Sequence, residues 1–189
     1  MIRTLGFSLG VAAAVFGAAL TVQGLQREAI SSQQRERRLD PSSPLIAAPA
    51  SADVRMGARL ARLQIPTIGV DEIVVEGVSP RQLAIGAGHY PGTAPVGGRG
   101  SVGIAGHRTG WGDPFLRLDE LERGDRIVLQ TRRDRFIYRV TNTKVVNPDA
   151  RWVLNGDPKV DASFELTLTT CTPVGTARDR LIVWAERAV

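Results

Sequence analysis

Three side chains in the second half of the chain have the chemistry for thiol-based nucleophilic catalysis: a thiol, an imidazole and a guanidinium. Cys171 is the only cysteine among 189 residues, so an intramolecular disulfide and a metal site built from several thiolates are both excluded. An ordinary thiol has a pKa of about 8.5 and needs a nearby base or cation to attack at neutral pH. Only His89 and His107 can supply an imidazole.

Cys171 follows directly on a strand-like run, Phe164 to Thr170, and stands just before Thr172 and Pro173. A group at the end of a strand can be both fixed and exposed. The alternative is that an isolated cysteine in a β protein is a small buried apolar residue. The polar neighbours of Cys171 favour the nucleophile.

His107 comes just after another strand-like run, Ser101 to Ala105, and next to Gly106. Arg180 stands nine residues after Cys171 and begins the run that ends at Ala185. A guanidinium stays protonated, so it cannot act as a base, but it can donate hydrogen bonds to a developing oxyanion. Arg178 is a competing candidate, since it lies two positions away and would share a strand face with Arg180.

His89 lies in a turn-rich segment and is interpreted as structural or groove-lining. No set of partner ligands accompanies it, so a metal role is not expected.

The elements that must position these groups are short β-type runs separated by Gly and Pro, which predict an all-β fold, closed or nearly closed into a barrel. Closure is favoured because it removes exposed sheet edges. Residues 132–135 predict a hairpin turn. Short helical connectors are expected at Pro80 to Leu83, Pro114 to Leu121 and Arg151 to Leu154. The expected strands are 61–65, 72–76, 101–105, 126–131, 136–140, 142–146, 164–170 and 181–185.

Composition excludes several broad classes. Hydrophobic residues make up 43% and charged residues 23% of the chain, which is ordinary for a globular domain and argues against wholesale disorder or a polytopic membrane protein. The net charge is +5, and the basic residues are spread along the chain rather than gathered in one stripe. A nucleic-acid partner is therefore not expected.

The chain is expected to have three parts: residues 1–27 as a cytoplasmic start and transmembrane anchor, 28–52 as a flexible linker, and 53–189 as the folded domain. The run from Thr4 to Leu25 has no charge and is long enough to cross a hydrocarbon core of about 30 Å. A cleaved signal peptide is the alternative, disfavoured by the length of the run and the lack of a small-residue cleavage site. The flanking arginines do not decide the orientation.

Two segments together resemble the signatures of the sortases, the cell-wall cysteine transpeptidases. Thr167 to Cys171 (TLTTC), followed by Arg180 to Ala185 (RLIVWA), resembles the segment around the sortase cysteine and arginine. Gly88 to Phe115, followed by Leu118 to Ile127, is similar to the block around the sortase histidine, most like class E and then class D.

The resemblance covers about Leu60 to Glu186. It implies an eight-stranded barrel with Cys171 as nucleophile, His107 as acid/base partner and Arg180 as the cation at the oxyanion or substrate.

The resemblance also implies a function and a location. The implied enzyme is a single-pass membrane protein of a Gram-positive cell, with its catalytic domain outside the membrane. It would cleave an exported protein between Thr and Gly of a C-terminal LPxTG or LAxTG motif through a thioacyl intermediate, and transfer that protein to an amine of a peptidoglycan precursor. Neither a cofactor nor a metal is expected.

Substrate contacts are expected from Trp111, Thr170 and His89. Trp111, four residues after His107, occupies the position that the resemblance associates with LAxTG recognition, and favours an LAxTG preference. A pilin-polymerising sortase is a less favoured alternative, because nothing resembles an added lid. A non-enzymatic surface-binding barrel with an inert Cys171 also remains open. An L,D-transpeptidase is excluded, because Thr169 stands where that class has a histidine.

Overall fold

A computed structural model describes residues 54–160 and 163–188. The expected membrane span and the linker, residues 1–27 and 28–52, lie outside these residues. Within the described part, no helix combines the length and the apolar character that a membrane crossing requires.

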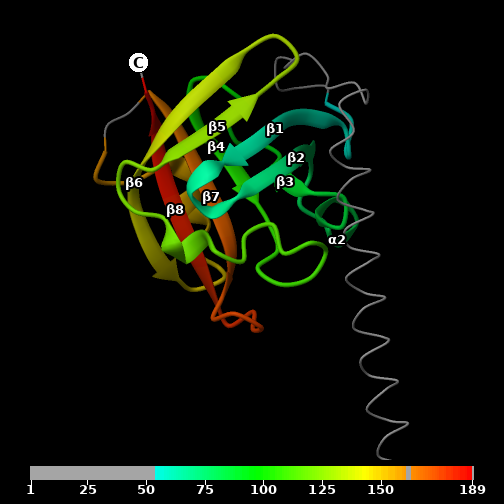
Figure 1. Cartoon of the computed structure of the whole chain (residues 1–189), viewed down its shortest axis with the longest axis vertical. Helices are drawn as coiled ribbons and strands as arrows, with labels where there is room; N and C mark the ends of the chain where they lie inside the picture. Colours follow the sequence, from blue (N-terminus) through cyan, green and yellow to red (C-terminus); the bar gives the residue numbers. More distant parts are fainter. Residues whose placement is uncertain (1–53, 161–162, 189) are drawn as a thin grey trace, which may run out of the picture. The chain divides into compact units, whose positions relative to one another are not determined.

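Eight strands close into a barrel in the order β1-β2-β3-β4-β7-β8-β6-β5 (Figure 1). The pairs β2–β3 and β4–β7 are parallel, and the other neighbours are antiparallel. The connecting helices are short: η1, Pro66–Ile68; α2, Pro80–Leu83; η2, Leu118–Glu120; and η3, Arg151–Asn155. The strands are β1, Arg59–Ile65; β2, Val70–Glu76; β3, Ala87–His89; β4, Gly100–Ala105; β5, Arg126–Gln130; β6, Arg135–Val146; β7, Phe164–Thr172; and β8, Asp179–Arg187.

The expected closed eight-stranded all-β barrel is confirmed, although two details of the strand assignment were wrong. The expected strands 136–140 and 142–146 form one strand, β6, because the register shift after Val140 is absorbed as a bulge that leaves pairing with β8 intact. The eighth strand is β3, which the sequence did not predict because it has three residues and contains a glycine.

The connectors at 80–83 and 151–154 were placed correctly. Only residues 118–120 of the expected 114–121 segment are helical.

β7 is covered on both faces. Leu166 and Leu168 point into the barrel and are fully buried, whereas Thr167 and Thr169 point the other way, because successive side chains alternate across a strand. These threonines are also buried: the Thr167 hydroxyl donates to the Val153 carbonyl of η3, 3.4 Å away, and Thr169 Oγ1 lies 2.9 Å from the Tyr90 hydroxyl. β7 is therefore buried on both faces from Glu165 to Thr170 and becomes partly exposed at Cys171 and Thr172.

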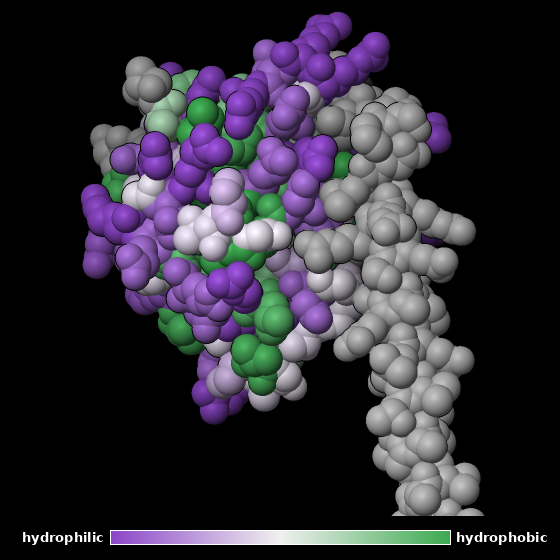
Figure 2. Space-filling view, in the orientation of Figure 1, coloured by the Kyte–Doolittle hydropathy of each residue, from purple (hydrophilic) through white to green (hydrophobic). Residues whose placement is uncertain are grey.

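Because β4 and β7 are parallel neighbours, the loops that follow them begin at the same end of the barrel. Gly100 pairs with Phe164 and Ala105 with Thr169, so the residue numbers of each pair differ by 64 along the whole ladder. The β4–η2 loop and the β7–β8 hairpin therefore begin side by side, at the lower end of the barrel in Figure 1. Hydrophilic side chains cover most of the face in Figure 2, with hydrophobic ones in scattered patches between them, some of which lie toward this same end.

We expect Leu166→Ala to lower the free energy of unfolding by about 2–5 kcal/mol, because it removes a fully buried side chain and leaves a cavity. Val145→Ala is the matched control, since Val145 is also in a strand but is 55% exposed, and its effect should stay within about 0.5 kcal/mol. Urea unfolding monitored by circular dichroism measures both. Equal effects of the two variants would contradict the assignment of β7 to the core.

Candidate active site

Cys171 and Arg180 lie directly opposite each other where β7 and β8 reach the end of the barrel. They are Cα partners in the antiparallel ladder, so their side chains leave the sheet on the same face with Cβ atoms about 5 Å apart. Cys171 is partly exposed and forms no disulfide. The ladder thus sets a fixed cation beside an accessible thiol.

The parallel β4–β7 ladder brings the backbone just before His107 to the side of β7 opposite β8. The last paired residues are Ala105 and Thr169, and the Gly106 N–H continues the pattern by donating to the Thr169 carbonyl at 3.0 Å. Residues 107 and 171 lie two positions beyond the last pair, so continuing the same register predicts His107 beside Cys171, at the spacing of about 4.8 Å that separates adjacent strands. Imidazole, thiol and guanidinium therefore come from three adjacent segments of backbone.

Three further contacts hold the chain at Gly106 and His107. The Thr170 hydroxyl donates to the Gly106 carbonyl at 2.8 Å, and the Phe115 N–H donates to the His107 carbonyl at 3.0 Å. The Phe115 ring packs so closely over Gly106 that a Cβ there would lie 2.5 Å from the ring. The residue before the histidine must therefore be glycine for the β4–η2 loop to fold back in this way.

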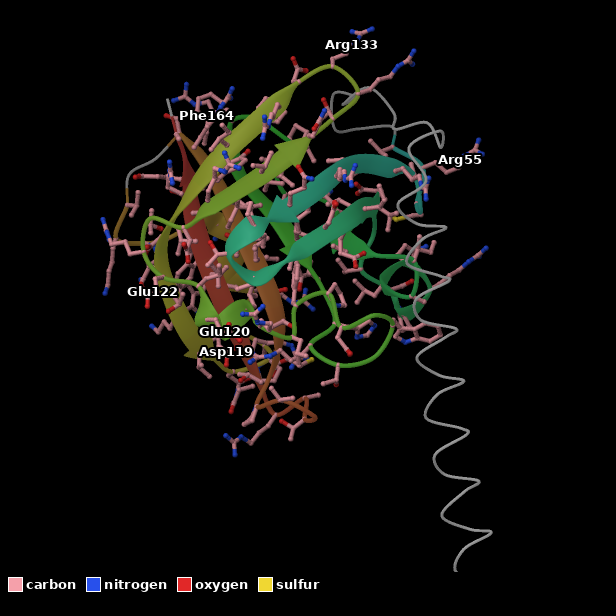
Figure 3. All side chains as sticks on the ribbon, in the orientation of Figure 1. Arg55, Asp119, Glu120, Glu122, Arg133 and Phe164 are labelled. Atoms are coloured by element: carbon pink, nitrogen blue, oxygen red, sulfur yellow. The ribbon has the colours of Figure 1, made fainter. Side chains whose placement is uncertain are left out.

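Arg108 anchors the chain on the other side of His107. Its side chain is buried, and Nη2 lies 2.7 Å from the Asp119 carboxylate. Asp119 belongs to η2 and is labelled in Figure 3, at the end of the barrel where the β4–η2 loop lies. The backbone of His107 is thus held on both sides.

His107 sits in a setting that favours the neutral imidazole. Its Nε2 is buried and has no hydrogen-bond partner among the described residues. Burial lowers the pKa of His107 below its ordinary value, because desolvation penalises the charged ring. A neutral ring can take the proton from a thiol and return it later as an imidazolium.

The guanidinium of Arg180 is oriented by the hairpin that follows β7. Its Nη1 donates to the carbonyls of Ala177 and Asp179, each at 3.0 Å. Further donors on Nη2 and Nε belong to the same planar group. The competing candidate, Arg178, precedes β8, is 73% exposed and pairs with the Asp179 carboxylate. The structure therefore favours Arg180 over Arg178 as the cation at the thiol.

A cavity of about 430 Å³ reaches Arg180 along the outer face of β7 and β8. Thr169, Arg180 and Ile182 form its floor, since these residues alternate outward on the two strands. Tyr90 and Pro91 line one side, and the segment from Val146 to Leu154, which includes η3, lines the other. The lining combines apolar side chains with a few polar ones, as is usual for a ligand site.

The remaining sequence-predicted site residues are placed differently. Thr170 and His89 are buried, and both are engaged inside the protein, so direct contact with a substrate is not supported for either. Trp111 is exposed, with a φ of 58°, in the β4–η2 loop, and it does not line the groove cavity. Tyr90 lines the groove, and nothing in the sequence marks it for this place except its position next to His89.

No group of three or more His, Cys, Asp or Glu side chains that could hold a metal ion occurs within residues 54–160 and 163–188.

Comparisons with known proteins identify the family and agree with the fold. The family model described as Sortase domain matches residues 63–188. Sortase SrtE1 of Streptomyces coelicolor is 35% identical over 143 residues, covering 69% of this chain and 40% of the relative. Sortase SrtE2 of the same organism is 36% identical over 153 residues, covering 73% of this chain and 58% of the relative. The match therefore spans about half the length of these two relatives.

Among solved structures, that of sortase E1 from Streptomyces coelicolor with a tripeptide in the active site matches with a TM-score of 0.64 and 34% identity. The match covers 70% of this chain and 90% of that chain.

We expect His107 to titrate below about 6.5, the ordinary histidine value, because burial lowers its pKa in the folded state. The unfolded chain then binds more protons, so this group costs stability as the pH falls through 6.5 and costs none well above it. Nuclear magnetic resonance measures the midpoint directly, and His107→Asn should lose less stability than the wild type between pH 7 and pH 5. A midpoint above 6.5 would contradict the buried, neutral ring.

Proposed function

The chain belongs to the sortase family, and we propose that it acts as a cysteine transpeptidase on a sorting motif, with Cys171 as nucleophile. The observation that carries the proposal is that the backbone just before His107 and the first residues of β8 pair with β7 on its two sides, which supports His107 and Arg180 as neighbours of the Cys171 thiol. A barrel used only for binding does not need a thiol, an imidazole and a guanidinium side by side at the end of a groove.

In the first half-reaction, the Cys171 sulfur attacks the carbonyl carbon of the Thr in the motif. His107 takes the thiol proton, either before or during attack, and becomes an imidazolium. The carbonyl oxygen becomes an oxyanion, which receives hydrogen bonds from the Arg180 guanidinium. The C–N bond to Gly then breaks, and His107 gives its proton to the leaving amine.

In the second half-reaction, an amine attacks the thioester and His107 accepts its proton. The tetrahedral intermediate again places its oxyanion at Arg180, the C–S bond breaks, and the proton returns to the sulfur. One amide bond has been exchanged for another, so neither a nucleotide nor a redox cofactor enters the balance. Burial of His107 favours the neutral ring that both steps require as a base.

The groove supports a short, extended substrate that runs toward the thiol. Its floor is formed by residues on the strands that carry Cys171 and Arg180, so a peptide lying on it presents a carbonyl at the catalytic end. A peptide substrate is also supported by the solved structure of sortase E1, which holds a tripeptide in its active site. We propose an LPxTG or LAxTG motif, with a preference for LAxTG through the exposed Trp111 in the β4–η2 loop.

The proposed setting is the outer face of a Gram-positive membrane. Residues 4–25 would anchor the chain, exported proteins would supply the motif, and a peptidoglycan-precursor amine would be the acceptor. The sequence supports this through the uncharged run of residues 4–25 and through its resemblance to sortases.

We expect the protein to form a thioacyl adduct on Cys171 when it is incubated with an LAxTG peptide, and to pass the acyl group to an added amine. Intact-protein mass spectrometry detects the adduct, which should be absent in Cys171→Ala. An LPxTG peptide is expected to acylate more slowly, and equal rates would remove the proposed role of Trp111. A wild-type protein that forms no adduct with either peptide would contradict the proposed function.

We expect Arg180→Gln to slow acylation by about 10²–10³-fold, the usual cost of losing one oxyanion donor. Arg178→Gln is the matched control, two residues away in the same hairpin, and should change the rate by less than about twofold, because Arg178 is exposed and paired with Asp179. Single-turnover kinetics with the LAxTG peptide compare the two. A larger loss in Arg178→Gln than in Arg180→Gln would reassign the oxyanion cation.

A further inference from the structure

The second histidine of the chain lies in a closed polar environment beside the groove. His89, at the end of β3, has its Nδ1 2.7 Å from the Glu76 carboxylate of β2, and the two side chains are only 5% and 9% exposed. Its Nε2 lies 2.9 Å from the Ala94 carbonyl oxygen and 3.1 Å from the Thr93 hydroxyl. Both ring nitrogens are therefore engaged.

The partners of Nε2 require it to carry a hydrogen. A carbonyl oxygen such as that of Ala94 can only accept. The Thr93 hydroxyl has one hydrogen, which it donates to the Tyr90 carbonyl at 2.8 Å, so toward His89 it too is an acceptor. The donor at this position must therefore be Nε2–H.

The other ring nitrogen faces a carboxylate. If Nε2 carries the only hydrogen of a neutral ring, the Nδ1 lone pair points at Glu76, and an ionised carboxylate there would oppose it. A buried charge with such an opposed contact is strongly disfavoured. The pair therefore holds one proton more than an ionised glutamate beside a neutral histidine. That proton can lie on Nδ1 or on the carboxyl, and because imidazole is a stronger base than a carboxylate, it is assigned to Nδ1.

The turn that follows β3 connects the His89–Glu76 pair to the groove. The Tyr90 N–H donates to the Gly103 carbonyl of β4 at 2.9 Å, and the Thr93 hydroxyl accepts from the Gly103 N–H at 3.1 Å. The Tyr90 hydroxyl lies 2.9 Å from the Thr169 hydroxyl, two residues before Cys171 on the same strand face. Tyr90 and Thr169 both line the cavity.

We propose that His89 is a positioning residue: an imidazolium paired with the Glu76 carboxylate fixes the turn from Tyr90 to Ala94, and thereby the groove wall against which the peptide lies. This proposal rests on the proposed function, which identifies the groove as the binding site of the peptide. His89 itself does not contact the substrate.

The protonation state of the His89 ring can be measured by nuclear magnetic resonance, because the chain has only two histidines and their signals can be told apart. The full chain, labelled with ¹⁵N-histidine, is examined at pH 7 by long-range ¹H–¹⁵N correlation, with His107→Asn used to assign the signals. His89 should show two protonated ring nitrogens. In Glu76→Gln, the amide can donate to Nδ1, so His89 should become neutral with one aprotic nitrogen. An aprotic ring nitrogen at His89 in the wild-type protein overturns the proposal.

Kinetics test the positioning role. His89→Phe removes both ring hydrogen bonds, and it should raise KM for the LAxTG peptide about tenfold, as for loss of one hydrogen bond to a charged group. The acylation rate at saturating peptide and the rate of Cys171 alkylation by iodoacetamide should change by less than about twofold. Glu76→Gln keeps the hydrogen bonds of the ring but removes the ion pair, so it should raise KM measurably, by less than His89→Phe does.

Asp71→Asn is the control for loss of a carboxylate from β2. Asp71 pairs with Arg62 of β1, and neither residue lines the groove, so this variant should alter neither KM nor the His89 spectrum.

An unchanged KM in a folded His89→Phe protein contradicts the positioning role. If His89→Phe does not fold, the wild-type and Glu76→Gln spectra still decide the protonation. The spectra need no peptide, so failure of the proposed function would appear as absence of the thioacyl adduct and would leave them unaffected.

Discussion

The active end of this barrel depends on the parallel pairing of β4 with β7. That ladder keeps a constant register of 64 residues, and it continues for one hydrogen bond beyond the last paired residues, from Gly106 to Thr169. Continued by two residues, the same register predicts His107 beside Cys171. The antiparallel partner of β7 then supplies Arg180 opposite the same cysteine. β7 is therefore the strand whose two ladders determine where His107 and Arg180 lie relative to the thiol.

Because side chains alternate along β7, those on one face pack in the barrel core and those on the other face lie toward the candidate site. Leu166 and Leu168 point inward and are fully buried in the barrel, whereas Thr169 lines the groove and Cys171 follows it on the same outward face of the strand. Thr170, on the inward face, donates to the Gly106 carbonyl and so fixes the residue before the histidine. The same enclosure that fixes His107 also buries Nε2, which lowers the pKa of the imidazole.

Local patterns in the sequence predict much of this arrangement. A cysteine, a histidine and an arginine at the ends of three strand-like runs indicated thiol chemistry, and the resemblance to sortases implied their roles. The pattern did not predict β3, whose three residues have no periodicity that could be read, or the contacts of its last residue with Glu76 of β2. Nor did it show that Thr170 and His89 are buried, because burial on a barrel depends on which loops fold over each strand.

The most direct test of the central claim uses the chain's single cysteine. His107→Cys places a second thiol at the position that the β4–β7 register sets beside Cys171. Adjacent strands hold Cα atoms at a separation that a disulfide can bridge. The structure predicts an intramolecular disulfide on mild oxidation of His107→Cys, detected by peptide mapping, and none in Arg126→Cys on β5. Only intermolecular disulfides in His107→Cys would contradict the register on which the site rests.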